Sequence, residues 1–293
     1  MMLSWLLGLM VYTGQMLPQD TLSITKDGRT ISVVKRAEFS YQYPGLPIIA
    51  EQKYNSFLDQ LDQQLTVPSK DARLDQNGNI VAEQVGYQVY RKAFTEQFYA
   101  FYFGNSSVNL EIPMLPVYPR IDSELLADIK SKRIGRYVTS FNSGNKTRTN
   151  NIKLAVKAIN NYVIFPGEKF SFNQVVGKRT AEKGYLRAPV IVRGEYSEDI
   201  GGGICQVSST LFNAVDNAGL QIVQRFSHTR EVPYIPKGRD ATVSWFGPDF
   251  EFKNKYNQPV LIRAKTLGNL LVIKLYSSEV INYQPKEVPN PPY

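Results

Sequence analysis

Cysteine and histidine, the residues that most often bind zinc, are nearly missing from this chain of 293 residues, which has one of each, Cys205 and His228. A single cysteine excludes an intramolecular disulfide and any zinc site built from several thiolates. A single histidine also argues against a histidine-based metal site. The composition therefore predicts neither a metal nor another cofactor.

Long basic runs are missing as well. The 34 Lys and Arg residues outnumber the 26 Asp and Glu residues but are scattered, and no basic stripe alternates with aromatic residues as in nucleic-acid surfaces. The formal net charge of +8 suits an anionic surface such as a bacterial wall or a membrane face. We expect no nucleic-acid partner.

Charged residues are also missing from the first seventeen positions, which are apolar except for Ser4, Thr13 and Gln15. This run has the length of the hydrophobic part of an export signal and is short for a membrane span, which needs about 20 residues. Because basic residues do not precede it, either the natural start lies upstream or the signal is atypical. We expect 1–20 to be an export signal or membrane anchor of an extracytoplasmic protein; a buried N-terminal helix is the alternative.

Aromatic residues are plentiful, with 18 Tyr and 15 Phe, and occur together with 20 Gly and 17 Pro. This composition is typical of a globular, sheet-rich protein. Apolar periodicity predicts the α+β class: an N-terminal α/β module over 21–134, a domain with a helix on a mainly antiparallel sheet over 135–278, and an extended, disordered Pro-rich tail over 279–293. In the second domain we expect a loop over 142–150, an extended piece at 170–173, a buried strand at 188–192, and strands at 220–226, 241–246, 260–265 and 270–276.

The most distinctive stretch is Gly201-Gly202-Gly203-Ile204-Cys205-Gln206. Apolar residues then recur at positions 207, 211, 214, 215 and 218, which predicts an amphipathic helix that ends at Gly219. Cys205 should therefore lie in the first helical turn, where unpaired N–H groups and the positive end of the helix dipole favour a thiolate. Three glycines before a helix also indicate a close approach of the backbone to a ligand.

His228 lies 23 positions after Cys205, on what we expect to be a following strand. This pattern is typical of a nucleophilic thiol with an imidazole base, and a third polar group then orients the ring. Asp240, at the expected start of the next strand, is the first candidate for that group, with Asp249 and Asn254 as alternatives. The backbone N–H groups of Cys205 and Gln206 could face a developing oxyanion.

Two other interpretations stay open. A free cysteine in a helix is most often a small buried apolar residue. The glycine loop and helix N-terminus could instead bind an anion without any reaction. We do not expect nucleotide binding, because the loop lacks the lysine of a phosphate-binding loop.

Several motifs in this order resemble the VanW family, which is named for an accessory protein of vancomycin-resistance clusters and occurs in Gram-positive bacteria. The resemblance runs from about Arg136 to Lys265 and rests on 166–173, 176–180, Gly184-Tyr185, 201–211 and Ser227-His228. The region from about Ala37 to Lys132, clearest at 68–72, resembles the peptidoglycan-binding module that often precedes VanW domains. The segment from Gly203 to about Asp240 is similar to the active-site layout of transglutaminase-like and papain-like proteins.

The resemblance implies a cell-envelope protein that binds or remodels peptidoglycan or its stem peptides. Our hypothesis for the reaction is acyl transfer or amide hydrolysis, with Cys205 as nucleophile, His228 as base and Asp240 as orienting group. Non-catalytic binding of peptidoglycan or another anionic ligand, or a role in envelope or spore assembly, is the alternative. We expect ligand contacts from seven further residues, Gly201, Gly202, Gly203, Gln206, Ser208, Asn173 and Tyr185.

Overall fold

Helices and strands form where the apolar periodicity predicts them in most of the chain. The computed structural model describes residues 20–41, 47–104, 107–192 and 195–292. The expected export signal or anchor falls almost wholly outside these residues. Among the described helices, none has the length and apolar character needed to cross a membrane.

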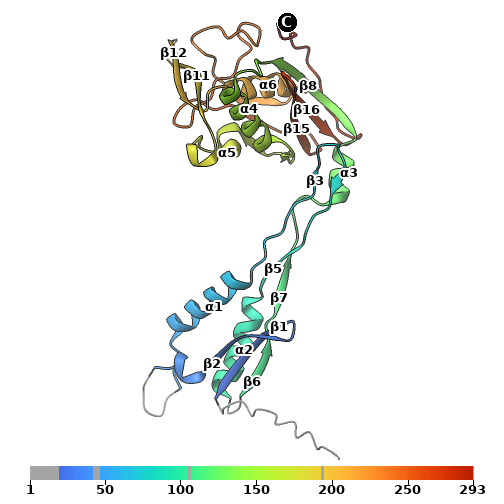
Figure 1. Ribbon diagram of the computed structural model, residues 1–293. Coiled ribbons are helices and arrows are strands. Elements are labelled where there is room, and N and C mark those ends of the chain that lie inside the picture. The colour runs from blue at the N-terminus through green and yellow to red at the C-terminus, as the bar shows by residue number, and fades with distance from the viewer. Residues whose placement is uncertain (1–19, 42–46, 105–106, 193–194, 293) are drawn as a thin grey trace, which may run out of the picture. The chain divides into compact units, whose positions relative to one another are not determined.

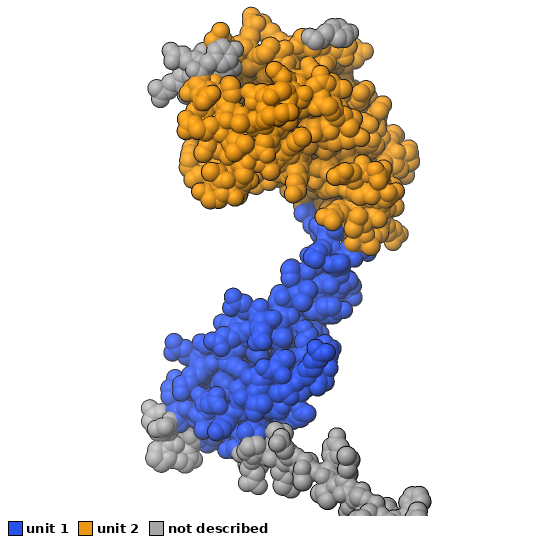
Figure 2. All heavy atoms as spheres, viewed as in Figure 1, with its two compact units in different colours: residues 1–71, 83–120 blue, residues 72–82, 121–293 orange. Residues whose placement is uncertain are grey.

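The described structure divides into two compact units (Figure 2). Unit 1 comprises residues up to Asp71 and Glu83–Arg120, and unit 2 comprises Ala72–Ala82 and Ile121–Tyr293. The boundary expected at position 134 lies instead inside a continuous strand of unit 2, β8 (Lys132–Ser140). A short hairpin at 73–81, which sequence order assigns to the first part, belongs to unit 2.

Unit 1 is a small α/β module, as predicted. Helices α1 (Glu51–Leu65) and α2 (Arg91–Phe103) bury apolar and aromatic residues at helical spacing, among them Tyr54 and Leu58 in α1 and Phe94 and Phe98 in α2. A three-stranded sheet has the order β2-β1-β6, in which β1 (Thr21–Lys26) pairs antiparallel with β2 (Arg29–Lys35) and parallel with β6 (Val108–Glu111). The remaining elements are the 3-10 helix η1 (Arg36–Phe39) and the strand pair β5 (Gly86–Val89) and β7 (Met114–Val117). Buried aromatic rings of both helices form the core.

Unit 2 is built on an antiparallel sheet of order β8-β16-β15-β9. Its strands besides β8 are β9 (Val163–Ile164), β15 (Val260–Leu267) and β16 (Leu270–Ser277). Helix α6 (Ile204–Asn217) packs on β8 and β16, and α4 (Lys146–Ile159) packs on β15 and on α6 (Figure 1). Gly135 in β8 permits this contact, because a Cβ there would lie 2.5 Å from the Ala214 carbonyl oxygen.

The other elements of unit 2 surround this core. The hairpin β3 (Arg73–Leu74) and β4 (Ile80–Val81) turns at Asn77-Gly78, and α3 (Ser123–Ile129) is capped by the Asp122 side chain. A second antiparallel sheet joins β10 (Lys169–Ser171), β14 (Glu251–Lys253) and β13 (Gln221–Gln224). Helices α5 (Phe172–Val176) and η2 (Ala181–Lys183) precede a ribbon of β11 (Arg187–Val192) and β12 (Glu195–Ile200). The α+β class is therefore correct.

Several local predictions are wrong. Helix α4 begins at Lys146, inside the expected loop, because Asn145 caps it by accepting a hydrogen bond from the Arg148 N–H. Strand β11 belongs to a two-stranded ribbon that is exposed at Pro189 and is therefore not a buried strand. Residues 241–246 form no strand, and the piece expected to be extended from 170 becomes helical at Phe172.

The tail is extended but ordered against unit 2. Tyr137 donates a hydrogen bond of 2.8 Å to the Pro289 carbonyl, and Asn217 donates one of 2.9 Å to the Lys286 carbonyl. Ile281 is buried in the core. The prediction of disorder is wrong here because the Pro-rich composition does not reveal the partners that the fold supplies for these carbonyl groups.

Candidate active site

The glycine loop positions Cys205 by placing backbone against backbone. At Gly202 a Cβ would lie 2.6 Å from the carbonyl oxygens of both Ala188 and Pro189, so β11 and the loop can approach only because the side chain is missing. Gly203 has φ +102°, a left-handed conformation that favours glycine. Helix α6 starts directly after it, so Cys205 is its second residue, as predicted.

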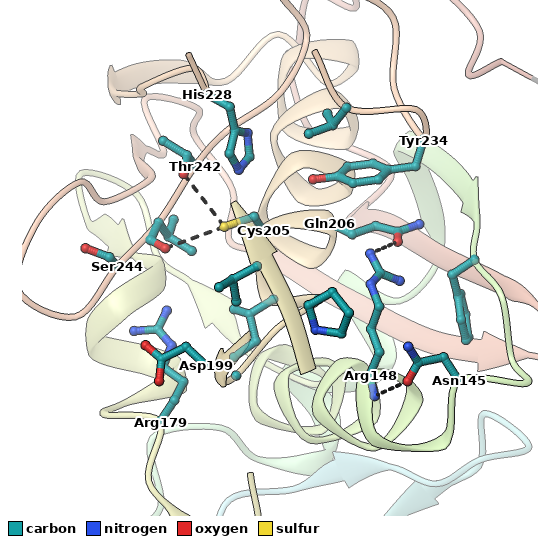
Figure 3. Close-up of a pocket in the computed structure, with 18 of the residues that line it drawn as sticks. Asn145, Arg148, Arg179, Asp199, Cys205, Gln206, His228, Tyr234, Thr242 and Ser244 are labelled. Atoms are coloured by element: carbon teal, nitrogen blue, oxygen red, sulfur yellow. Dashed lines mark hydrogen bonds between the residues drawn. The ribbon is translucent and has the colours of Figure 1, made fainter. Parts of the chain in front are cut away.

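The thiol of Cys205 faces a cavity and a polar loop. The sulfur lies 3.7 Å from the Thr242 Oγ1 and 3.5 Å from the Val243 carbonyl oxygen (Figure 3). The residue is partly exposed and lines a cavity of about 910 Å³. Cys205 is therefore not the small buried apolar residue of the alternative interpretation.

His228 and Asp240 form a close pair beside this thiol. The His228 Nδ1 lies 2.6 Å from the Asp240 Oδ2, and the same oxygen accepts a hydrogen bond of 2.6 Å from the His228 backbone N–H. Both side chains are only 8% exposed. Since Nδ1 contacts Asp240, the other ring nitrogen is left for the thiol, and the ring lies next to Cys205 (Figure 3). Both residues lie in loops, so the strands expected for them are wrong.

Helix α6 holds the loop that carries Asp240. Ser208 donates a hydrogen bond of 2.5 Å to the Ala241 carbonyl, and Ser209 accepts one of 2.9 Å from the Ala241 N–H. Asn213 donates a bond of 2.8 Å to the Arg239 carbonyl. The polar residues of the helix thus supply backbone partners to an irregular segment, which replaces the pairing that a strand would give.

The charges of this cluster favour a thiolate next to an imidazolium. Burial alone would raise the pKa of Cys205, but a hydrogen bond to His228 and its positive charge bring that pKa below its ordinary value. Burial lowers and the Asp240 and Cys205 contacts raise the pKa of His228, with a net rise to about 9. The same contacts with His228 outweigh burial and hold the pKa of Asp240 below its usual value.

An oxyanion can be stabilised only in part by the N–H groups that the sequence suggested. The Gln206 N–H donates to the Gly203 carbonyl at 3.1 Å, so it is not available. For the Cys205 N–H, no acceptor is present among the described residues, as is usual in a first helical turn. The Gln206 side chain is engaged with Thr139, Ser140 and Arg148.

The other predicted ligand contacts separate into two groups. Gly201, Gly203 and Gln206 line the cavity. Gly202, Ser208, Asn173 and Tyr185 do not line it; all four are buried, and the last three have structural roles. The Ser208 hydroxyl bonds to the Ala241 carbonyl, the Asn173 amide donates to the carbonyls of Ser244 and Pro248, and Tyr185 belongs to the apolar core.

The alternative orienting groups do not contact His228. The Asp249 carboxylate accepts hydrogen bonds from the Ser171 hydroxyl and the Asn173 N–H. The Asn254 amide donates to the carbonyls of Ile164 and Gln258. Both residues hold loops within unit 2, so Asp240 is the candidate that the fold brings to the imidazole.

Sequence reasoning missed two arginines that line the cavity, Arg148 of α4 and Arg179. Both side chains are half-buried, and desolvation lowers the pKa of each guanidinium group. Arg179 lies in one of the motifs that carry the family resemblance, at 176–180. The motif was noticed, but no chemical role was given to this arginine. Arg148 lies in the segment that was expected to be a loop, so no sequence pattern indicated that α4 would carry it to the cavity.

Comparison with known proteins gives the family. A model described as VanW like protein matches residues 147–276. The chain is 57% identical over 275 residues to YoaR, described as an uncharacterized protein, of Bacillus subtilis (strain 168), and the alignment covers 94% of this chain and 91% of that protein. The chain belongs to the VanW family.

A second VanW-family relative is the Vancomycin B-type resistance protein VanW of Enterococcus faecalis (strain ATCC 700802 / V583). It is 36% identical over 109 residues, which are 36% of this chain and 40% of that protein. No solved structure matches the chain. The family prediction is confirmed, whereas the peptidoglycan-binding module of the N-terminal part stays a prediction.

Proposed function

We propose that this VanW-family protein acts in the cell envelope as a cysteine-nucleophile enzyme that transfers or hydrolyses acyl groups of peptidoglycan stem peptides. The observation that carries the proposal is the pairing of Cys205, His228 and Asp240 at the wall of a cavity. The chain has one cysteine and one histidine, and the fold brings both to the same place from positions 23 residues apart.

The reaction uses each group in a defined role. The Cys205 thiolate attacks the carbonyl carbon of an amide, and the oxyanion forms near the Cys205 N–H at the helix N-terminus. The His228 imidazolium gives its proton to the leaving amine as the C–N bond breaks, which leaves a thioester. Water or an acceptor amine then attacks the thioester and gives its proton to His228, and the C–S bond breaks to release the Cys205 thiolate beside the imidazolium. Asp240 holds the ring and stabilises its charged form.

Three features support a wall peptide as the substrate. The related Enterococcus faecalis protein is named a vancomycin resistance protein. The positive net charge favours an anionic polymer. Trp245 and Phe246 line the cavity and are 41% and 87% exposed, which suits contact with a large polymer outside it.

Purified peptidoglycan tests the proposal. We would incubate the full chain and its Cys205→Ala variant with peptidoglycan fragments that carry stem peptides and follow the products by mass spectrometry. The expected result is new acyl-transfer or hydrolysis products with the wild type only, together with a thioester adduct at Cys205. Equal products from both proteins would contradict the proposed mechanism.

Non-catalytic binding is a second candidate, favoured by the two half-buried arginines in the cavity and by the helix N-terminus. It predicts that both proteins sediment equally with insoluble peptidoglycan and that neither releases products. Equal sedimentation with products from the wild type alone would support the enzyme.

A further inference from the structure

The cavity beside Cys205 holds two guanidinium groups that have no carboxylate partner. Elsewhere in the molecule arginines form ion pairs, for example Arg239 with Asp216 at 2.8 Å and Arg91 with Asp62 at 2.7 Å. No such pair involves Arg148 or Arg179 among the described residues. Both guanidinium groups are partly desolvated, and the Cys205 thiolate beside both and Asp249 beside Arg179 act on them only through space, without an ion pair. Such charges are costly, which indicates that they serve a ligand.

Arg179 gives the clearest sign of an incomplete site. Its two terminal nitrogens are buried, and neither has a hydrogen-bond partner among the described residues. The Cζ of this group lies over the Phe172 ring, 5.8 Å from its centroid, a contact that gives its N–H groups no hydrogen-bond acceptor. Buried side-chain nitrogens almost always have acceptors, so these N–H groups lack an acceptor that a ligand oxygen would supply.

Arg148 is fixed rather than free. Its Nη2 donates a hydrogen bond of 2.8 Å to the Oε1 of Gln206, whose amide donates in turn to the Ser140 carbonyl at 2.8 Å. Gln206 directly follows the nucleophile, so this bond ties the position of the guanidinium to that of Cys205. The two arginines lie on different sides of the thiol (Figure 3).

The acidic residue in the lining of the cavity is Asp199. Its carboxylate is exposed and accepts a hydrogen bond from the Ile200 N–H, and it makes no ion pair with Arg179. Lys178 also lines the cavity. The positive groups near Cys205 therefore outnumber the acidic ones.

We propose that Arg179 binds a carboxylate of the substrate while Arg148, on the other side of the thiol, adds positive charge to the same cavity, so that the substrate is a peptide with a free carboxylate near the carbonyl that Cys205 attacks. The planar fork of an arginine matches the two oxygens of a carboxylate, and the buried N–H groups of Arg179 gain the acceptors they lack. This inference rests on the proposed function, because it assigns the substrate class for the same site.

Alkylation of Cys205 tests the anion site without knowledge of the substrate. The thiolate displaces iodide from iodoacetate, which carries a carboxylate, or from iodoacetamide, which is neutral and of nearly the same size. We expect the ratio of the two rates to be at least about tenfold higher for Cys205 than for free cysteine, because arginine attracts the carboxylate in a partly desolvated site. The ratio should fall toward that of free cysteine in Arg179→Gln and Arg148→Gln.

Matched variants control for the loss of charge and for changes in the fold. Lys157→Gln removes one positive charge from the exposed face of α4 and should leave the ratio unchanged. Arg179→Lys keeps the charge but loses the fork and should give an intermediate ratio. The iodoacetamide rate reports the thiolate and the fold in every variant, so a general loss of reactivity cancels in the ratio.

A ratio like that of free cysteine, or one that the arginine substitutions do not change, would overturn the carboxylate site. A Cys205 that reacts with iodoacetamide no faster than free cysteine at neutral pH would instead overturn the proposed function, and the two failures are therefore distinguishable.

The peptide itself is tested by calorimetry. The Cys205→Ala chain would be titrated with a synthetic stem tetrapeptide that ends in a carboxylate and with the same peptide ending in a carboxamide. We expect the carboxylate form to bind roughly tenfold to a hundredfold more tightly, and the difference to disappear in Cys205→Ala/Arg179→Gln. Equal binding of the two peptides would contradict the assignment.

Discussion

Replacement of Asp240 by asparagine should shift the acid–base properties of the whole cluster. In the wild type, the pKa of His228 rises from 6.5 to about 9. This change corresponds to roughly 3 kcal/mol in favour of the imidazolium, at about 1.4 kcal/mol per pH unit. The carboxylate of Asp240, 2.6 Å from the Nδ1 of a ring that is 8% exposed, is the largest of the contacts that raise it.

The direction in which Asp240→Asn changes the reactivity of the thiol follows from the pKa shifts of Cys205 and His228. In the wild type the thiolate–imidazolium pair is present between the lowered pKa of Cys205 and the pKa of about 9 of His228. Thiolate reactivity is lost as the pH falls through the pKa of Cys205, and the proton that the leaving group needs is lost as the pH rises through 9. In Asp240→Asn the pKa of His228 falls and that of Cys205 rises. The pH range in which the thiolate–imidazolium pair exists therefore becomes narrower at both ends.

The measurement is the rate of iodoacetamide alkylation between pH 5 and 10. We expect the wild-type inflection to lie well below the ordinary thiol pKa of about 8.5 and the Asp240→Asn inflection to lie at least about one pH unit higher. At pH 6.5 the variant should react roughly tenfold more slowly. Asp249→Asn is a matched control, because this carboxylate bonds Ser171 and Asn173 and not the imidazole.

Identical inflections in the wild type and Asp240→Asn would refute this reasoning, provided that near-ultraviolet circular dichroism shows a folded variant. A second variant, His228→Gln, removes the imidazolium entirely and should bring the inflection to at least the ordinary thiol value. If His228→Gln kept the low inflection, the helix N-terminus and not the histidine would be the source of thiolate stabilisation.

Three stability predictions follow from the contacts that build the site. Gly202→Ala should lower the free energy of unfolding by about 2 kcal/mol or more in urea, since its Cβ would overlap backbone oxygens 2.6 Å away. Ser209→Ala should cost about 1–3 kcal/mol, because the buried Ala241 N–H loses its acceptor at 2.9 Å. Tyr137→Phe removes the bond of 2.8 Å to the Pro289 carbonyl and should speed proteolysis of the tail while it lowers stability by about 1 kcal/mol.

The first two of these predictions have control variants in the same chain. Gly238→Ala places a methyl group in open space at φ +73°, so it should cost less than Gly202→Ala in the same urea titration. An equal loss at both positions would show that close packing at the loop is unimportant. Ser209→Thr keeps the hydroxyl and should retain more stability than Ser209→Ala. An unchanged cleavage rate in Tyr137→Phe would mean that other contacts hold the tail.

The sequence by itself determined the periodic elements. The apolar stripe from Val207 to Ala218 lies in the core, although α6 is buried on its polar side as well, and Gly203 and Gly219 bracket that helix because each takes a positive φ. The family also followed from sequence motifs, and Cys205 could be placed in the first turn of α6. Local periodicity determines these features, so neighbouring residues carry the information.

Only the tertiary structure decided what surrounds the thiol. His228 and Asp240 lie in loops whose shape depends on side chains of α6, above all Ser208, Ser209 and Asn213, which take the place of a strand partner. No local pattern predicts such bonds, and 241–246 therefore resembled a strand in the sequence. Arg148 and Arg179 come to the cavity from separate segments, and the lack of an acceptor for Arg179 exists only once the chain has folded around it.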